Sequence, residues 1–198
     1  MSERAVFFDR DGTLCREVGY VNHPSRLELM PDAAVTLRRL HERGWRAIVV
    51  SNQAGIARGY FTPAVLEDTH RRLRRLLAGA GTSVDGLYAC VHHPEVGPPG
   101  FRRACDCRKP DGGMLISAAR EHGIELSESV MVGDSFKDVA AGRAAGVLKT
   151  VLLRTGYGRG EILKHSQRTD LWPDHVADDL TGAASWIFDV AGDRRESR

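Results

Sequence analysis

Short apolar runs alternate with stretches of helical periodicity along most of this 198-residue chain, and that alternation limits the fold more than any other feature. The apolar runs have the length and the β-branched or aromatic content of buried strands. They lie at residues 5–8, 46–50, 86–89, 129–132 and 150–153, with a further short run near Val176. Because strands that alternate with helices build parallel sheets covered on both faces, the pattern predicts an α/β fold.

The segments between these runs carry residues that start and stop helices. Thr62-Pro63 is a typical helix start, and Gly44 and Gly146 are typical helix ends. Predicted helices cover residues 32–43, 62–78, 113–122, 139–145 and 183–190, and residues 156–160 are predicted to form a glycine-rich loop before a weak helix. We expect a Rossmann-like parallel sheet with helices on both faces. We expect no large cap domain, since no insertion is long enough to build one.

The length and the apolar pattern also bound the organisation of the chain. A chain of 198 residues fits one domain, so we expect a single domain over residues 1–191 and a flexible tail at 192–198. The sequence contains neither an apolar run long enough to span a membrane nor the pattern of a secretion signal. We therefore expect a cytoplasmic protein, and a monomer is the default state because no wide apolar stripe is apparent.

The charge balance gives no indication of a nucleic-acid partner. The net charge is +2, from 28 basic and 26 acidic residues, so there is no global basic field. Four arginines gather within residues 71–75, but leucines at helical spacing interleave with them. This pattern favours the solvated face of an amphipathic helix over a nucleic-acid patch.

The first predicted strand ends in a polar sequence that points to chemistry. Residues 5–8 lead into Asp9-Arg10-Asp11-Gly12-Thr13, which places two carboxylates one residue apart where the strand gives way to a loop. Ligands of open α/β sheets bind at such carboxyl ends. Two carboxylates this close repel each other unless a cation lies between them or one is protonated. A plain turn of Asp and Gly is the alternative interpretation of this sequence.

The Asp-x-Asp-Gly-Thr sequence resembles the signature of the haloacid dehalogenase superfamily of phosphohydrolases. The resemblance implies that Asp9 is the nucleophile that accepts the phosphoryl group. Asp11 would then protonate the leaving alcohol and deprotonate the hydrolytic water. At later strand and loop ends, Ser51 would bind the phosphoryl oxygens, Lys109 would neutralise their charge and Asp134 would bind a metal ion.

The chemistry of phosphate transfer explains why such a set is needed. A phosphate monoester dianion repels a carboxylate nucleophile, so cations and hydrogen-bond donors must surround the transferring group. Mg²⁺ suits this task because it takes hard oxygen ligands. Asp9 and Asp134 would supply carboxylate oxygens to Mg²⁺, while the resemblance gives Asp11 a backbone carbonyl contact. Asp138 is predicted to order the loop or the lysine.

A second constellation consists of Cys90, His92, Cys105 and Cys107. Three thiolates and one imidazole complete a tetrahedral zinc set, and a full set of protein ligands predicts a structural rather than a catalytic zinc. The ion would clamp a zinc-binding loop, residues 90–107, immediately before Arg108-Lys109 and hold the lysine over the phosphate. His93 is the rival imidazole, Cys15 is interpreted as a non-ligand, and reduced cysteines in a loop are the plain alternative.

Within the superfamily, this ligand set before Arg-Lys-Pro resembles a small group that contains the heptose bisphosphate 7-phosphatases and the histidinol-phosphate phosphatases. Residues 51–59 and the long zinc loop favour the first. The resemblance implies Mg²⁺-dependent removal of the C7 phosphate of D-glycero-D-manno-heptose 1,7-bisphosphate. It assigns contacts with the sugar or its second phosphate to Glu17, Val18, Gly19, Tyr20, Asn52, Gln53, Ala54 and Arg108. A histidinol-phosphate phosphatase and a non-catalytic zinc-stabilised interaction domain are the alternatives.

Overall fold

A six-stranded parallel sheet forms the centre of the protein in the computed structural model, which describes residues 3–167 and 169–192. The strands are β1 (Arg4–Phe8), β2 (Trp45–Asn52), β3 (Gly86–Cys90), β4 (Val130–Gly133), β5 (Lys149–Leu153) and β6 (His175–Ala177). They follow the order β3-β2-β1-β4-β5-β6, and each neighbouring pair is parallel. The order reverses between β1 and β4, which is where open α/β sheets bind ligands at their carboxyl ends.

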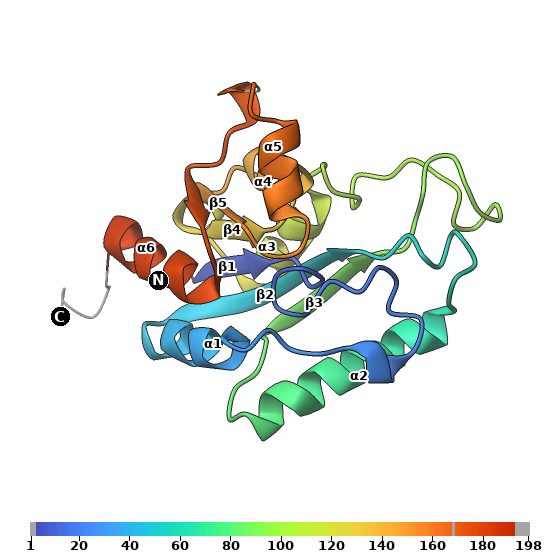
Figure 1. Cartoon of the computed structure of the whole chain (residues 1–198), viewed down its shortest axis with the longest axis horizontal. Helices are drawn as coiled ribbons and strands as arrows, with labels where there is room; N and C mark the ends of the chain where they lie inside the picture. The colour runs from blue at the N-terminus through green and yellow to red at the C-terminus, as the bar shows by residue number, and fades with distance from the viewer. Residues whose placement is uncertain (1–2, 168, 193–198) are drawn as a thin grey trace.

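Helices cover both faces of this sheet (Figure 1). They are α1 (Ala33–Glu42), α2 (Pro63–Gly79), α3 (Gly113–His122), α4 (Phe136–Ala145), α5 (Gly158–Lys164) and α6 (Leu180–Ala191). One core joins the sheet to α1, α2 and α6 through residues such as Leu37, Leu73 and Leu180. Another core joins the opposite face to α3 and α4 through Leu115 and Ala141. The predicted α/β fold with a Rossmann-like parallel sheet is confirmed.

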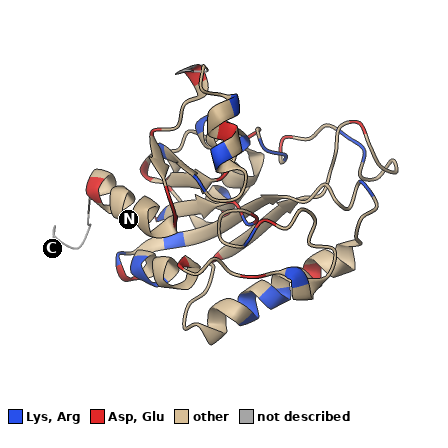
Figure 2. Ribbon diagram, in the orientation of Figure 1, with Lys and Arg blue, Asp and Glu red and all other residues tan. Residues whose placement is uncertain are grey.

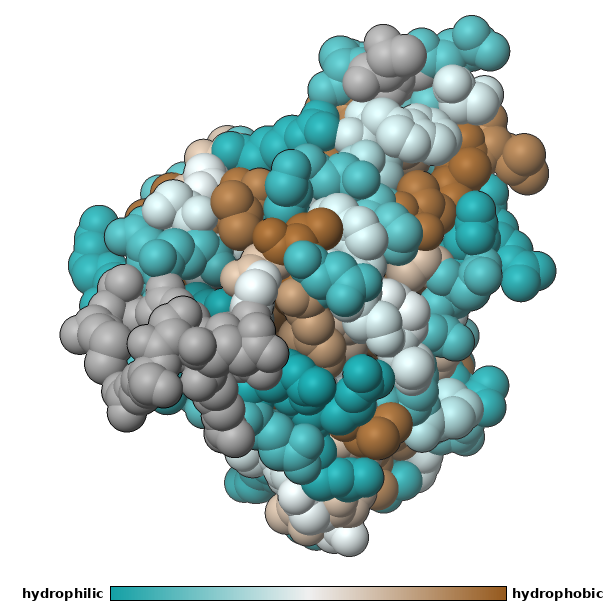
Figure 3. Space-filling model, turned by 90° about the vertical axis from the view of Figure 1, so that its left-hand side faces the viewer, coloured by the Kyte–Doolittle hydropathy of each residue, from teal (hydrophilic) through white to brown (hydrophobic). Residues whose placement is uncertain are grey.

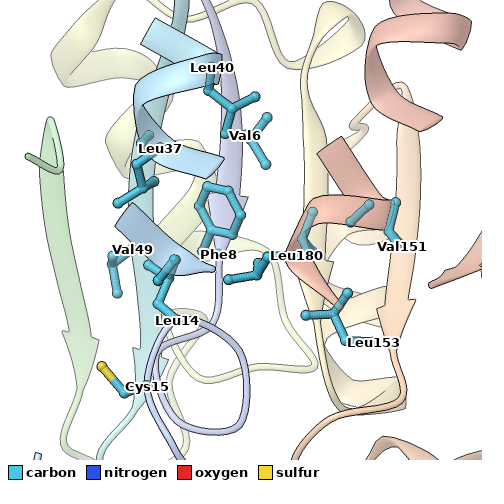
Figure 4. Packing of buried hydrophobic residues seen from close by; sticks show 14 of the residues in the cluster. Val6, Phe8, Leu14, Cys15, Leu37, Leu40, Val49, Val151, Leu153 and Leu180 are labelled. Atoms are coloured by element: carbon cyan, nitrogen blue, oxygen red, sulfur yellow. The ribbon is translucent and has the colours of Figure 1, made fainter. Parts of the chain in front are cut away.

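The side chains of β1 alternate between these two cores and fix where the strand ends. Val6 and Phe8 lie in the core that contains α1 and α6 (Figure 4), and Ala5 and Phe7 lie in the other. All four are at most 1% exposed. Fully burying a side chain such as Phe8 stabilises the fold by about 1.5–3 kcal/mol. Slipping the strand by one residue would exchange the two faces, so burial holds Asp9 at the strand's end.

Two predicted helices begin three residues too late, and one predicted loop is partly helical. α4 begins at Phe136 rather than at residue 139, because Ser135 and Asp138 form a capping box at its start. α6 begins at Leu180 rather than at residue 183, because Asp179 accepts a hydrogen bond from the Gly182 N–H. The predicted glycine-rich loop at 156–160 is partly helical, since α5 starts at residue 158. A Cβ there would lie 1.7 Å from the Leu153 carbonyl oxygen, so only glycine lets α5 start against the end of β5.

The surface agrees with the predicted charge pattern. Helix α2 buries Leu73 and Leu77 and exposes Arg71, Arg74 and Arg75, whose positions appear as basic bands along the helix in Figure 2. Figure 3 shows apolar residues in small patches separated by polar ones on the face that it presents. Among the described helices, none combines the length and the apolar character needed to cross a membrane. Residues 193–198 of the predicted tail lie outside the described residues.

Candidate active site

Two aspartates from distant parts of the chain meet where the strand order reverses. Asp9 follows β1 and Asp134 follows β4, and the Asp9 N–H donates to the Val132 carbonyl oxygen at 3.0 Å. Gly12 turns the chain after the nucleophile motif with a φ of 80°. A Cβ on Gly12 would lie 2.0 Å from Asp134 Oδ2, so glycine is required both by the turn and by the approach of Asp134.

A buried lysine lies between the carboxylates. Lys109 is 3% exposed, and its Nζ lies 2.9 Å from Asp9 Oδ1 and 2.6 Å from Asp138 Oδ1. The same ammonium donates to the Val50 carbonyl oxygen at 2.8 Å. The Asn52 side chain accepts from the Lys109 N–H at 3.1 Å and donates to its carbonyl oxygen at 2.9 Å. The end of β2 therefore holds the lysine segment over Asp9.

The acidic site, which we define as Asp9, Asp134 and Asp138, carries more negative charge than Lys109 offsets. One carboxylate oxygen from each residue lies within 4.8 Å of the others. Burial, reinforced by Asp138 and Asp11 and opposed by Lys109, raises the pKa of Asp9 to about 7. Burial, together with Asp9 and Asp138, raises the pKa of Asp134 to about 8. Hard oxygen ligands with surplus negative charge fit a divalent cation such as Mg²⁺.

The side chain of Asp11 lies beside this site without joining it. Its Oδ1 accepts from Arg10 Nε at 3.0 Å, and its Oδ2 accepts from Arg10 Nη2 at 2.7 Å. Gln53 Nε2 donates to Asp11 Oδ2 at 3.0 Å and to Ser51 Oγ at 2.8 Å. Because side-chain donors occupy both of its oxygens, this arrangement is compatible with a metal contact from the Asp11 backbone carbonyl rather than from its carboxylate.

These groups surround a cavity of about 350 Å³. Its lining contains the predicted catalytic residues and all of the predicted substrate residues except Val18: Asp9, Asp11, Ser51, Lys109 and Asp134, with Glu17, Gly19, Tyr20, Asn52, Gln53, Ala54 and Arg108. Val18 instead packs against the hydrophobic core that contains α1 and α6. The loop after the nucleophile motif, the end of β2 and the segment at 108–109 therefore close the cavity, as expected without a cap domain.

Besides Asp138, five lining residues were not predicted as site residues: Val21, Arg58, Ser135, Lys137 and Tyr157. Arg58 lies in the segment 51–59, and Lys137 lies in the polar sequence after β4, so both occur in motifs that were recognisable. Tyr157 carries no such signal. Its N–H donates to Asp134 Oδ2 at 2.8 Å, and its hydroxyl hydrogen-bonds Glu17. The start of α5 thus reaches both the acidic site and the loop at 15–30.

The Cys/His cluster, which we define as Cys90, His92, Cys105 and Cys107, has the geometry of a zinc site. Its three sulfurs lie 3.2 to 3.6 Å apart, and His92 Nδ1 lies 3.5 Å from Cys107 Sγ. A tetrahedral site with metal–sulfur bonds of about 2.3 Å has edges of about 3.8 Å. Burial and Arg103 lower the pKa of His92, which favours the neutral imidazole that metals bind. The donor set fits Zn²⁺.

The rival ligands lie elsewhere. His93 Nε2 lies 2.9 Å from Arg58 Nη2, and its Nδ1 accepts from the N–H groups of Glu95 and Val96. Cys15 is fully buried in the core that contains α1 and α6, as expected for a non-ligand. Figure 1 shows the segment at 90–107 projecting beyond the carboxyl ends of β2 and β3. Arg108 Nη1 ties this segment to the cavity by donating to the His92 carbonyl oxygen at 3.2 Å.

Comparison with known proteins agrees with this geometry. Residues 106–183 match a HAD-hydrolase-like family model. The chain is 41% identical over 191 residues to the D-glycero-D-manno-heptose-1,7-bisphosphate 7-phosphatase of Thermosynechococcus vestitus, which covers 94% of this chain and 96% of that relative. It is 43% identical over 152 residues to the D-glycero-beta-D-manno-heptose-1,7-bisphosphate 7-phosphatase of Escherichia coli K12, which covers 77% of this chain and 80% of that relative.

A solved structure is similar over the same extent. The D,D-heptose 1,7-bisphosphate phosphatase from B. bronchiseptica, complexed with magnesium and phosphate, superposes with a TM-score of 0.82 at 30% identity. The match covers 94% of this chain and 99% of that one. Because sequence and fold agree over nearly the whole length of both chains, this chain belongs to the HAD-like phosphatases, in the family of the D-glycero-D-manno-heptose-1,7-bisphosphate 7-phosphatases.

Proposed function

We propose that this chain removes the C7 phosphate from a D-glycero-D-manno-heptose 1,7-bisphosphate through a phosphoaspartate on Asp9. The observation that carries the proposal is the contact of Asp9 with the buried ammonium of Lys109, next to Asp134 and at the floor of a polar cavity. A carboxylate nucleophile with a cation beside it suits phosphoryl transfer. The names of the relatives support the heptose substrate over histidinol phosphate and over a non-catalytic interaction domain.

The residues divide the work as follows. Asp9 attacks phosphorus while Asp11 gives its proton to the departing sugar oxygen, so the sugar leaves as an alcohol. Asp11 then takes a proton from the water that attacks the phosphoaspartate, which releases inorganic phosphate and restores the Asp9 carboxylate and the Asp11 carboxylic acid. Ser51 and Lys109 hold the phosphoryl oxygens. Mg²⁺, held by Asp9, Asp134 and the Asp11 backbone carbonyl, would supply charge neutralisation for the transferring group.

The cavity also offers groups for the rest of the substrate. Arg108 lies in the lining, and its planar guanidinium suits the second phosphate because it can bind two oxygens at once. Glu17, Gly19 and Tyr20, from the loop at 15–30, also line the cavity and would face the sugar hydroxyls. We further propose a structural Zn²⁺ in the Cys/His cluster and a monomeric, cytoplasmic enzyme.

Phosphate release tests the substrate. The purified protein with Mg²⁺ is assayed against both anomers of heptose 1,7-bisphosphate and against histidinol phosphate, and kcat/KM is compared among the three because that ratio measures specificity. We expect a strong preference for one heptose anomer, with heptose 1-phosphate as the product. A preference for histidinol phosphate, or release of the C1 phosphate, would contradict the proposal. A variant with Asp178→Asn, remote from the cavity, serves as the matched control.

A further inference from the structure

Arg10 is a buried cation that the proposed mechanism does not use. It lies between the two aspartates of the motif, and it is 1% exposed although it is one of the largest side chains in the protein. A buried arginine is rare unless it is paired, because burying a charge is costly. Its partner is its own neighbour in sequence, Asp11, which it grips through two parallel hydrogen bonds of 3.0 and 2.7 Å.

This contact constrains both oxygens of the Asp11 carboxylate. A guanidinium that bonds both oxygens of a carboxylate fixes its plane as well as its distance. Gln53 adds a third donor at 3.0 Å on Oδ2, and the same amide reaches Ser51. The Asp11 side chain is still 16% exposed and lines the cavity. Arg10 and Gln53 therefore hold the Asp11 carboxylate on its protein side, while its exposed part faces the cavity where substrate would lie.

The surroundings of Arg10 leave its charge directed at Asp11. Burial and the nearby guanidinium lower the pKa of His70 to about 4, so this imidazole on α2 is neutral at pH 7. Within the described part of the chain, Arg10 Nη1 and His70 Nε2 are both buried without a hydrogen-bond partner. The ion pair with Asp11 is thus the strong interaction that the Arg10 guanidinium makes.

We propose that Arg10 is a positioning residue, which aims the Asp11 carboxyl at the leaving oxygen of the substrate, with Gln53 as the second support. This inference rests on the proposed function, because it assumes that Asp11 transfers the proton. The atoms balance when Asp11 enters this step as the carboxylic acid: as the bond between phosphorus and the sugar oxygen breaks and that to Asp9 forms, the Asp11 proton moves to the sugar oxygen and leaves the carboxylate that pairs with Arg10. The same edge of the carboxylate later accepts a proton from water.

Leaving-group dependence separates aiming from a merely structural role. An alkoxide needs a proton as it departs, whereas p-nitrophenolate leaves without one, so only alkyl phosphates depend on a well-aimed acid. Arg10→Lys keeps the charge but loses the two-pronged contact. We expect it to lower kcat/KM for heptose bisphosphate by roughly 10- to 100-fold and to change that for p-nitrophenyl phosphate by less than about threefold. Arg16→Lys, on an exposed arginine in the same loop, should change neither.

A second variant and a fold control complete the test. Arg10→Gln removes the charge as well as the paired contact and should show the same selective loss, and thermal unfolding identifies any variant that does not fold. Equal losses on both substrates in folded Arg10→Lys and Arg10→Gln, or no loss on heptose bisphosphate, would overturn the inference. If the wild type hydrolyses p-nitrophenyl phosphate but not heptose bisphosphate, the proposed function fails instead, and Arg10→Lys is then compared on an alkyl phosphate that the wild type accepts.

Discussion

The acidic site and the Cys/His cluster lie at the same end of the sheet but are assembled in opposite ways. Asp9 and Asp134 come from strands that are neighbours only in space, and the fold brings them together. The Cys/His cluster draws all its ligands from residues 90–107, in a stretch that forms no helix and no strand after Cys90. The fold of the sheet assembles the acidic site, whereas a bound ion would order the segment that carries the Cys/His cluster.

This difference predicts how each region should respond to the loss of a side chain. Side chains mounted on buried strand ends are held by the core, so removing one should change chemistry more than architecture. A segment rich in proline and glycine has little else to order it, so removing one ligand should change architecture first. Lys109 joins the two regions, since it follows the cluster by two residues and contacts the acidic site.

The nucleophile provides the largest expected effect. Asp9→Asn keeps the size of the side chain but removes the attacking oxygen anion, so kcat should fall on the order of 10⁴-fold or more. Steady-state phosphate release measures the loss. Zinc content should stay near wild type if the two regions are independent. Turnover within tenfold of wild type would rule out Asp9 as the nucleophile.

The second prediction concerns the zinc ligands. Cys107→Ser should abolish stoichiometric zinc binding and lower the free energy of unfolding by about 4 kcal/mol, since loss of a structural metal belongs to the most destabilising class of change. Elemental analysis and urea unfolding measure both effects, and limited proteolysis should cut within residues 94–104. Cys15→Ala, outside the cluster, should retain the zinc. Full zinc content in Cys107→Ser would refute the clamp.

The third prediction tests the link between the regions. Asp138 is 1% exposed and bonds Lys109, so Asp138→Asn leaves a buried ammonium with one carboxylate fewer. Breaking a buried pair costs about 3 kcal/mol or more, and urea unfolding measures it. Asp178→Asn breaks a pair with Arg154 in which Asp178 is 78% exposed, and it should change stability by less than about 0.5 kcal/mol. Equal effects of the two variants would contradict the role assigned to Lys109.

The smallest expected effect is a pH dependence. His70 has a pKa lowered to about 4 in the folded protein against 6.5 for the free side chain, so the unfolded chain binds more protons between these values. Stability from this group is present above pH 6.5 and is lost as the pH falls towards 4. Between pH 7.5 and pH 5 the loss should be about 2 kcal/mol. The loss should be absent from His70→Gln, so the stability difference between wild type and this variant should change by the same amount between the two pH values, as measured by urea unfolding.

The sequence predicted the parts of the site that lie at strand ends. Asp9, Ser51 and Asp134 follow apolar runs that could form only buried strands, so their convergence followed from sheet topology. The burial of Arg10 could not be predicted in this way, because an arginine between two aspartates is expected to be exposed to solvent. In the structure the chain folds over it. Burial of a charge depends on distant segments, here the chain around Gln53 and His70.

The positions of two further residues, Val18 and Tyr157, were not predicted from the sequence for related reasons. The family resemblance gave Val18 a substrate contact together with Glu17 and Gly19, but neighbouring residues of a loop can face opposite ways, and Val18 packs on the core. Tyr157 reaches the cavity because α5 starts at residue 158, inside the predicted glycine-rich loop, and because Asp134 accepts its N–H. Hydrophobic periodicity predicts neither contact, because both residues lie in loops and their contacts are with segments distant in sequence.

The interior position of β1 has a consequence for how the enzyme is made. One edge of this strand pairs with β4, which follows much later in the chain, and the Ala5 N–H reaches the Ser129 hydroxyl across 124 residues of sequence. A nascent chain that has produced β1, β2 and β3 therefore carries a five-residue apolar strand with one edge unsatisfied. During that interval synthesis exposes the strand that leads into the proposed nucleophile, and a pause before residue 130 would favour aggregation over activity.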